Sequence, residues 1–442
     1  MDLFVAPVWI FIIISYSIRI RNKRIKANPS YKYYVNGIGV KIIGAVCACF
    51  VFALWYRGGD TIGYYEQAVA ISRLLFKNPA EYFDILFGGC NATNVDYFDD
   101  GTGWMPAGVC VQCYPEVFLS RLIAPLCLLS FNSFVSMTIL LSWIGYSGIW
   151  KLYLLFCEKF PEIRRNLAIS ILFIPSVVFW GSCLLKDTVT IAALGWFTFT
   201  FYELFFKRNY KLINFIVIFV STYLLIAIKP YIFFAILPGS LIWASYHRIS
   251  IIRNKLIKFI VTPLFLFTGA YLGYFLITSF GGVLGDYSLD KIFYKAVLTQ
   301  SDLASDHYGG HNFNIGTFDP SISGVLSKAD VAITAALFRP FIWEVGNAMM
   351  LLSGLENSYI LFLTIGLIIR LKVFGFFRFI GSDPLLLFSM LFSIFFAFSV
   401  GLTTANFGAL VRLKIPCIPF YVSSLFILRH LYEKKYKRKL GF

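Results

Sequence analysis

Long apolar runs decide what this chain can fold into. Eleven runs approach the length of about 20 residues that a helix needs to cross a bilayer. The chain is 58% hydrophobic and only 14% charged, and a soluble protein of this length could not bury so much apolar surface. The sequence therefore predicts an all-α, polytopic integral membrane protein, with residues 1–442 forming one membrane domain. The eleven predicted transmembrane helices are 3–19, 39–56, 134–155, 166–182, 187–206, 212–228, 231–247, 256–279, 345–370, 384–401 and 410–428.

Basic clusters between these runs predict the orientation. The formal net charge is +16, but 26 of the 39 Lys and Arg residues fall in six clusters on one side of the eleven-helix arrangement. That distribution follows the positive-inside rule, so no nucleic acid partner is expected. The N-terminus is then outside and the C-terminus inside. We expect no cleavable signal peptide, because the first apolar run is followed by its basic residues and not preceded by them. The clusters are 19–41, 159–165, 207–211, 248–258, 370–378 and 429–439.

Two long loops fall on the external side in this arrangement. Loop 57–116 carries eight acidic residues and loop 281–330 carries six. Each is followed by a short apolar segment, 117–131 or 321–344, that we expect to form an interfacial helix. The alternative for either segment is a re-entrant loop, which is allowed where protein or water covers the backbone. The external regions are therefore 57–133 and 281–344.

The two loops contain cysteine and histidine residues that are candidates for a disulfide or for metal ligands. Cys90 can form a disulfide with Cys110 or Cys113. Cys110 and Cys113 lack a second ligand pair, so they do not favour zinc. His307 and His311 have no carboxylate partner in a known ligand pattern, which favours a loop that covers substrate over a metal site.

Charges that interrupt apolar runs are costly and need a reason. Directly after the second predicted helix stands Arg57-Gly58-Gly59-Asp60, with Tyr64 four residues on. The glycines allow a tight turn, Arg57 suits a phosphate or carboxylate, and Asp60 suits a general base or a sugar ligand. The alternative is a helix-ending turn with an Arg–Asp pair at the interface.

Two further places lie in short turns. Lys186 and Asp187 open the fifth predicted helix, whose N-terminus favours anions. The alternative is a helix cap with a snorkelling lysine. Lys229 stands between two long apolar runs and must reach water or a partner.

The fourth place runs from Arg339 to Glu344, with Asn347 and Glu356-Asn357 following. We expect it to act with Asn406-Phe407-Gly408 and Arg412-Leu413-Lys414 near the last helix. If the segment after Trp343 is helical, Glu344 and Asn347 share one face. The alternative is a buried Arg–Glu pair that fixes helix packing.

Together the outer helix ends offer more cations than acids. This balance suits a polyanionic headgroup such as a lipid diphosphate, for which arginine is well shaped. The acids would deprotonate an acceptor hydroxyl. The cations are Arg57, Lys186, Lys229, Arg339, Arg412 and Lys414, and the acids are Asp60, Asp187 and Glu344.

The same motifs resemble the oligosaccharide-repeat-unit polymerases of bacterial surface polysaccharides, the O-antigen and exopolysaccharide polymerase-like proteins. The resemblance implies an enzyme of the bacterial inner membrane that joins undecaprenyl-diphosphate-linked oligosaccharides at the outer leaflet, beside other polysaccharide-assembly proteins. It implies no metal or other cofactor. The matching segments are Arg57-Gly58-Gly59-Asp60 with Tyr64, Arg339-Pro340 to Glu344, and Asn406-Phe407-Gly408 to Arg412, with Pro416 and Pro419 in the last helix.

On this interpretation Arg339, Arg412, Arg57 and Lys186 hold the donor diphosphate, and Asp60 or Glu344 is the general base. Substrate contacts are also expected from Tyr64, Asp187, Lys229 and Asn406.

Two alternatives stay open. One is the broader class of polyprenyl-phosphate-sugar glycosyltransferases, the GT-C class, although Asp60 stands alone where that class usually has closely spaced acids. The other is a transporter of lipid-linked oligosaccharides, although a transporter should line a path to both faces and the charges here gather at one end. No Walker A motif or channel filter is present in the sequence.

Overall fold

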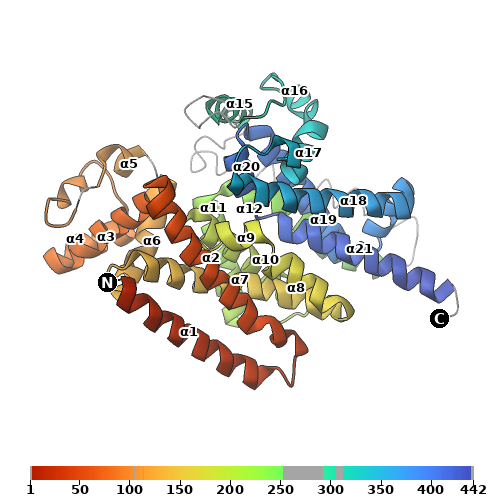
Figure 1. Cartoon of the computed structure of the whole chain (residues 1–442), viewed down its shortest axis with the longest axis horizontal. Coiled ribbons are helices and arrows are strands. Elements are labelled where there is room, and N and C mark those ends of the chain that lie inside the picture. The colour runs from red at the N-terminus through yellow and green to blue at the C-terminus, as the bar shows by residue number, and fades with distance from the viewer. Residues whose placement is uncertain (1, 104, 113, 252–291, 304–311, 440–442) are drawn as a thin grey trace. The chain divides into compact units, whose positions relative to one another are not determined.

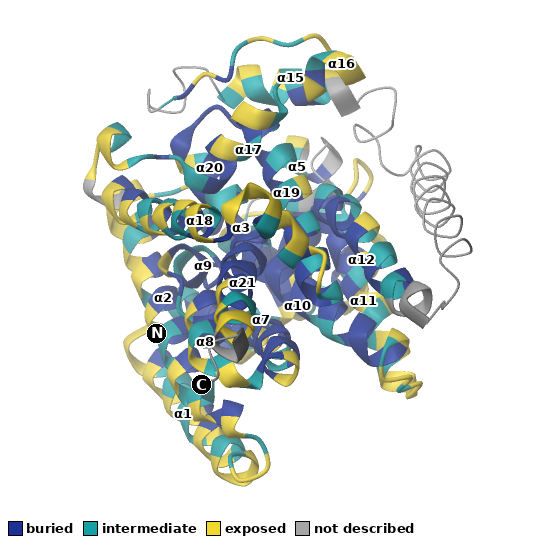
Figure 2. Cartoon of the chain, turned by 90° about the vertical axis from the view of Figure 1, so that its right-hand side faces the viewer, coloured by how far each residue is buried: buried dark blue, intermediate teal, exposed yellow. Residues whose placement is uncertain are grey.

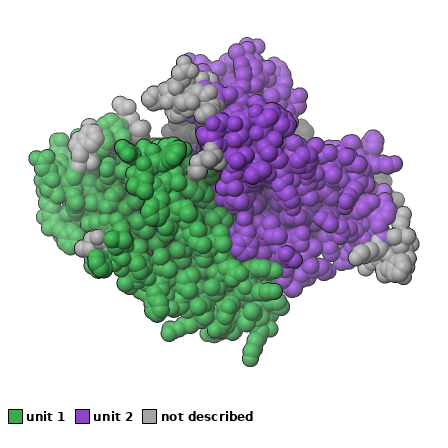
Figure 3. Space-filling model, viewed as in Figure 1, with its two compact units in different colours: residues 1–158, 177–201, 210–229 green, residues 159–176, 202–209, 230–442 purple. Residues whose placement is uncertain are grey.

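The computed structural model describes residues 2–103, 105–112, 114–251, 292–303 and 312–439 (Figure 1). The chain divides into two compact units, coloured green and purple in Figure 3. Within the described ranges every regular element is a helix, as the sequence predicts. Unit 1 contains 1–158, 177–201 and 210–229, and unit 2 contains 159–176, 202–209 and 230–442.

Unit 1 has its core at α7 (Phe134–Lys159) and α10 (Lys186–Phe205). Of the most apolar stretch of each helix, 72% of α7 and 83% of α10 is buried, and Figure 2 shows α10 in dark blue. The other helices of the unit are α1 (Asp2–Arg24), α2 (Tyr34–Phe50, continued by a π-helix Val51–Tyr56), α3 (Asp60–Lys77), α4 (Pro79–Phe83), α5 (Ala107–Gln112), α6 (Tyr114–Ser130) and α11 (Leu212–Ile228).

Glycine allows α7 and α10 to touch backbone to backbone. A Cβ built on Gly148 of α7 would collide with the backbone of Ala192 on α10, and one on Gly195 of α10 would collide with Gly148. Small residues that permit this approach drive helix association in membranes, where there is no hydrophobic gain between helices. The α7–α10 contact is thus a packing seam of unit 1.

Lys41 belongs to the first basic cluster by sequence, but it is not at a helix end near the membrane surface. It lies on α2 with 1% of its surface exposed. Its ammonium donates to the carbonyl oxygens of Gly181, at 2.6 Å, and Val177, at 3.4 Å. Lys41 therefore binds the backbone of the segment 177–181 and does not lie in a solvated loop.

Unit 2 is organised around α19 (Pro384–Thr403), which packs most extensively against α12, α17 and α21. Gly401 of α19 allows the backbone of Ala332 on α17 to come into direct contact. The helices of the unit are α8 (Arg164–Leu172), the start of α9 (Pro175–Trp180), α12 (Pro230–Ile251), α15 (Ile292–Leu303), α16 (Ile322–Leu326), α17 (Ala329–Phe338), α18 (Ala348–Ile380), α19, α20 (Phe407–Leu413) and α21 (Ile418–Lys439).

Six helices of the described chain are long and apolar enough to cross a membrane, or seven if the bent pair α20–α21 is one span. These helices indicate a multi-pass membrane protein. Eleven spans, the orientation and a single membrane domain stay predictions. The six are Asp2–Arg24, Pro29–Tyr56, Phe134–Lys159, Lys186–Phe205, Met350–Ile380 and Pro384–Thr403.

Two predicted continuous helices are broken. The segment 166–182 forms α8 and α9, interrupted before Pro175. The segment 410–428 forms α20 and α21, which meet at 67° across a break that contains Pro416. Proline lacks an N–H and disfavours the α conformation of the residue before it, so both breaks have a local cause. The predicted helix 256–279 lies outside the described residues.

The predicted loop 57–116 contains much helix. Tyr64, Ala68, Ile71 and Leu74 of α3 are buried at helical spacing, and α3 packs against α6. The predicted helix at 117–131 is confirmed as α6, while 321–344 forms α16, α17 and a 3-10 turn instead of one helix.

Candidate functional site

The turn after α2 has the tight geometry that its glycines predict. Arg57 and Gly59 have positive φ values of 51° and 89°, and both Arg57 and Asp60 are exposed. Asp60 is in the first turn of α3, where the helix dipole favours a carboxylate. Tyr64, one turn later, is buried at 4% exposure on the same side of α3.

Lys186 finds its partner in an acid that the sequence did not single out. Its Nζ lies 2.5 Å from Glu116 Oε1 of α6 and 5.9 Å from the ring centre of Tyr64. The Lys186 and Glu116 side chains keep 14% and 35% of their surface exposed. Three separate segments of unit 1 thus bring a cation, an acid and an aromatic ring together.

Asp187 and Lys229, predicted as two separate places, form one buried ion pair. Asp187 lies in the first turn of α10, and Lys229 follows the end of α11. Lys229 Nζ lies 2.5 Å from Asp187 Oδ1, with 8% and 0% of the two side chains exposed. The predicted turn at Lys229 is confirmed. We call Tyr64, Glu116, Lys186, Asp187 and Lys229 the unit 1 cluster.

In unit 2, Arg339 and Glu344 form a two-pronged ion pair. Arg339 Nε lies 3.0 and 3.1 Å from the two Glu344 oxygens, and Nη2 also donates to Oε1. The backbone N–H of Phe341 donates to Oε2 at 2.9 Å. The side chains of Arg339 and Glu344 keep 20% and 17% of their surface exposed, so both groups are partly accessible from solvent.

Two phenylalanine rings flank the guanidinium. Arg339 Cζ lies 4.8 Å from the ring centre of Phe313 and 5.3 Å from that of Phe407, which stack on each other. Asn406 helps bring the rings together, because its Nδ2 donates to Asn312 at 3.0 Å while its Oδ1 caps α20. Cation–π contact and ion pairing together fix the plane of the guanidinium.

Lys414 and Asn357 anchor the backbone behind Arg339. Lys414 is fully buried, and its Nζ donates to the Arg339 carbonyl at 3.0 Å and to Asn357 Oδ1 at 2.7 Å. Asn357 Nδ2 donates to the Pro340 carbonyl at 3.3 Å. We call Arg339, Glu344, Asn357, Asn406 and Lys414, with the two rings, the Arg339 site.

Other predicted residues of unit 2 fall differently. Arg412 lies half-buried in the last turn of α20, two residues before Lys414. Glu344 and Asn347 do not share a helix face, because Glu344 ends a 3-10 turn and exposed Asn347 caps α18 through Met350 N. His307 and His311 lie outside the described residues. The convergence of Arg57 and Asp60 with Arg339 and Arg412 stays a prediction.

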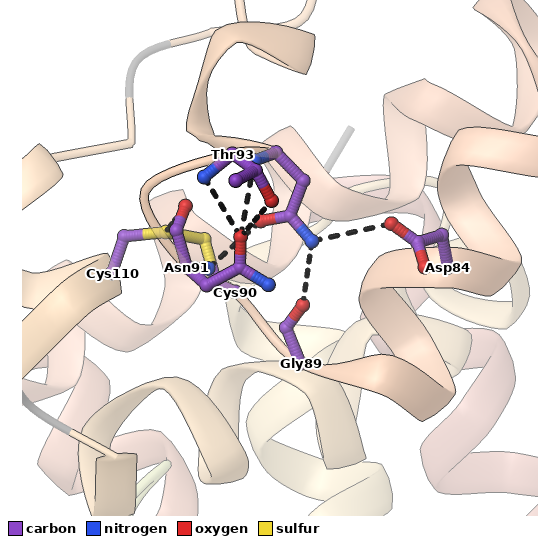
Figure 4. The surroundings of a disulfide bond; sticks show 7 residues. Asp84, Gly89, Cys90, Asn91, Thr93 and Cys110 are labelled. Atoms are coloured by element: carbon purple, nitrogen blue, oxygen red, sulfur yellow. Dashed lines mark hydrogen bonds between the residues drawn. A yellow bond between two sulfur atoms is a disulfide. The ribbon is translucent and has the colours of Figure 1, made fainter.

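The segment between α4 and α6 contains a disulfide, drawn in Figure 4. Cys90 pairs with Cys110 across 20 residues, which selects one of the two predicted pairings. The intervening turn is held by side-chain amides: Asn94 Nδ2 donates to Gly89 O at 2.9 Å and to Asp84 Oδ2 at 3.2 Å. The covalent bond therefore closes a segment that already has a defined turn.

Asp99 stabilises the next turn of the same segment. The backbone N–H of Thr102 and the ammonium of Lys77, 3.0 Å away, hold the pKa of the Asp99 carboxyl at about 2. Both effects favour the ionised carboxylate.

No protein-family model, curated protein or solved structure matches this chain.

Proposed function

We propose that the protein is a membrane-embedded polymerase or glycosyltransferase of the bacterial inner membrane that joins undecaprenyl-diphosphate-linked oligosaccharides at the extracytoplasmic face. The observation that carries the proposal is the Arg339 site. It presents a partly accessible guanidinium, fixed in direction by a carboxylate and two rings, beside a buried lysine. Arginine held in one plane is suited to bidentate binding of phosphate oxygens.

The disulfide supports an extracytoplasmic location for the segment after α3. Disulfides persist in oxidising compartments and are rare in the cytosol. Asp2, at the start of α1, accepts a hydrogen bond from Val135 N at the start of α7, so these two helices begin at the same end of unit 1. If α1 and α2 both cross the membrane, the N-terminus and the disulfide lie on the same, outer side, in agreement with the basic residues between them.

In the proposed reaction an acceptor hydroxyl attacks the anomeric carbon of the donor sugar. The bond from that carbon to the diphosphate oxygen breaks, and the lipid diphosphate leaves with the electron pair. Arg339 binds the diphosphate and stabilises the charge that develops on the leaving oxygen. Such electrostatic stabilisation from a single donor typically contributes about 10²–10³ in rate.

Glu344 serves as a positioning residue in this scheme. Its oxygens already accept hydrogen bonds from Arg339 and from Phe341 N, which leaves little capacity for an acceptor hydroxyl. The hydroxyl proton goes to a carboxylate general base, for which the sequence predicts Asp60, exposed at the turn after α2 in unit 1. Lys186 of the unit 1 cluster is proposed as a further contact for the anionic part of the substrate.

Complementation of a deletion in the native host tests the proposal. We expect deletion to leave single repeat units in place of a polysaccharide ladder on a gel, and wild type to restore the ladder. Arg339→Ala and Arg339→Lys should fail although they are expressed, because lysine does not reproduce the planar fork. Arg429→Ala is the control, since Arg429 forms an exposed pair with Glu433 on the surface of α21.

Other outcomes would assign another activity. A polysaccharide that loses one sugar but keeps its length would favour a single-sugar transferase. Accumulation of lipid-linked precursor on the cytoplasmic side would favour a transporter. A normal ladder in the Arg339→Ala strain would refute the assigned role of Arg339.

A further inference from the structure

A groove in unit 2 lies beside the Arg339 site. It has a volume of about 240 Å³ and is lined by apolar side chains, with Glu356 as its one charged residue. Val422 of α21 forms its floor, and α8 and α18 form its walls. The remaining lining residues are Ile169, Phe173, Ile174 and Pro175 on the α8 side and Leu352, Leu355, Tyr359 and Ile360 on α18.

The walls are fixed in place by hydrogen bonds to the floor helix. Ser170 of α8 and Ser423 of α21 lie 2.8 Å apart, and Thr364 of α18 and Tyr421 of α21 lie 3.1 Å apart. Glu356 also bridges the two walls, because it accepts hydrogen bonds from Ser176 Oγ at 2.6 Å and Ser176 N at 2.9 Å. The groove is therefore part of the packed fold of unit 2.

The wall of the groove formed by α18 has an exposed apolar face. Only 28% of the most apolar stretch of α18 is buried, and Leu352, Leu355 and Tyr359 are 57%, 50% and 54% exposed. A candidate membrane span with such an exposed apolar face is solvated by hydrocarbon. A hydrocarbon chain is thus the chemistry that the groove meets.

Two consecutive residues of α18 connect the groove with the Arg339 site. Glu356 lines the groove, and its neighbour Asn357 binds the Pro340 carbonyl and Lys414, which in turn binds the Arg339 carbonyl. A cationic site and an apolar groove on neighbouring residues of α18 match an amphiphile with an anionic head and one long chain.

We infer that this groove holds the part of the polyprenyl chain next to the diphosphate of the donor lipid, while Arg339 holds the diphosphate itself. The inference rests on the proposed function and adds the site of the lipid chain. Sites for drug-sized ligands are about 300–1,000 Å³, so a smaller groove takes only a section of a long chain. The rest of the chain stays in the bilayer.

Binding to the full-length purified protein tests the inference without an activity assay. The probes are undecaprenyl diphosphate, which has head and chain, and inorganic diphosphate, which has only the head. Leu355→Trp places a larger side chain in the groove. The control is Leu351→Trp on the same helix, because Leu351 is 44% exposed and does not line the groove.

We expect Leu355→Trp to weaken undecaprenyl diphosphate binding about tenfold or more, through loss of apolar contact, and to leave inorganic diphosphate binding unchanged. Leu351→Trp should bind both probes like wild type, and Arg339→Ala should lose both. Equal binding of undecaprenyl diphosphate by Leu355→Trp and Leu351→Trp would overturn the inference.

Photo-crosslinking of the wild-type protein keeps the test decisive if Leu355→Trp does not fold. An undecaprenyl diphosphate with a diazirine near its head should label peptides from 169–175 or 352–360. Labelling elsewhere, with normal binding, refutes the groove but leaves the proposed function intact. Absence of any undecaprenyl diphosphate binding by wild type refutes both.

Discussion

The buried pair of Asp187 and Lys229 offers a sharp stability test. Lys229→Met leaves the Asp187 carboxylate, whose side chain has 0% exposure, without its ammonium partner. Removing one member of a buried ion pair typically lowers the free energy of unfolding by about 3–5 kcal/mol. Because this carboxylate is fully buried, we expect a loss of about 4 kcal/mol. The double variant Lys229→Met/Asp187→Leu removes both charges, so we expect it to be at least about 2 kcal/mol more stable than Lys229→Met.

The assay is reversible unfolding of the purified protein in mixed micelles, with the detergent composition as the denaturing variable. Lys77→Met is the matched control, because Lys77 pairs with Asp99 at the surface of the same unit, with 39% and 52% of the side chains exposed. An exposed pair contributes about 0–1 kcal/mol. A cost of Lys229→Met no larger than that of Lys77→Met would refute a stabilising buried pair. So would a double variant that loses as much stability as Lys229→Met and Asp187→Leu added together.

Three other predictions concern unit 1. Cys90→Ser should destabilise the segment between α4 and α6 by about 3 kcal/mol, because the disulfide closes a loop of 20 residues, and faster proteolysis of that segment would show it. Gly148→Ala should lower stability by about 1–3 kcal/mol in the same micelle assay, because its Cβ would meet the α10 backbone. Gly39→Ala, with nothing within 4 Å, should not lower it; equal losses would refute the packing seam. The folded pKa of Asp99, about 2, lies below the unfolded value of about 3.9. Its contribution to stability is therefore complete above pH 4 and is lost as the pH falls toward 2. Pepsin cleavage near Asp99 should rise over that interval in wild type, and an Asp99→Asn variant should show no such rise.

The apolar runs predicted helices well where nothing interrupts them. Residues 212–228 form α11 with those same bounds, because the run is free of charge and proline. The segment 166–182 is also an apolar run without charge but contains Pro175, and the helix is interrupted just before it. A proline does not break every helix, because α12 continues through Pro238. The hydropathy of a run therefore predicts a helix but does not locate its breaks.

The candidate site was predictable where its contacts are short in sequence. Arg339 and Glu344 are five residues apart, so a pair between them could be read directly. Lys186 was expected to need a partner, but Glu116 stands 70 residues earlier and was only one of eight acids in its loop. Asn357 was expected near the Arg339 segment, but its partner Lys414 stands 57 residues away, and a neutral amide in an apolar run does not indicate which group it binds.

The hydrogen bonds from Ser176 to Glu356 set an order of events during biosynthesis. The two residues are 180 positions apart, so the backbone at the start of α9 lacks this partner until α18 has been synthesised. At about 5–20 residues per second, that interval is about 10–40 s. A backbone N–H without a partner is costly in hydrocarbon. We therefore expect the start of α9 to stay in contact with water or the insertion machinery until α18 has been synthesised.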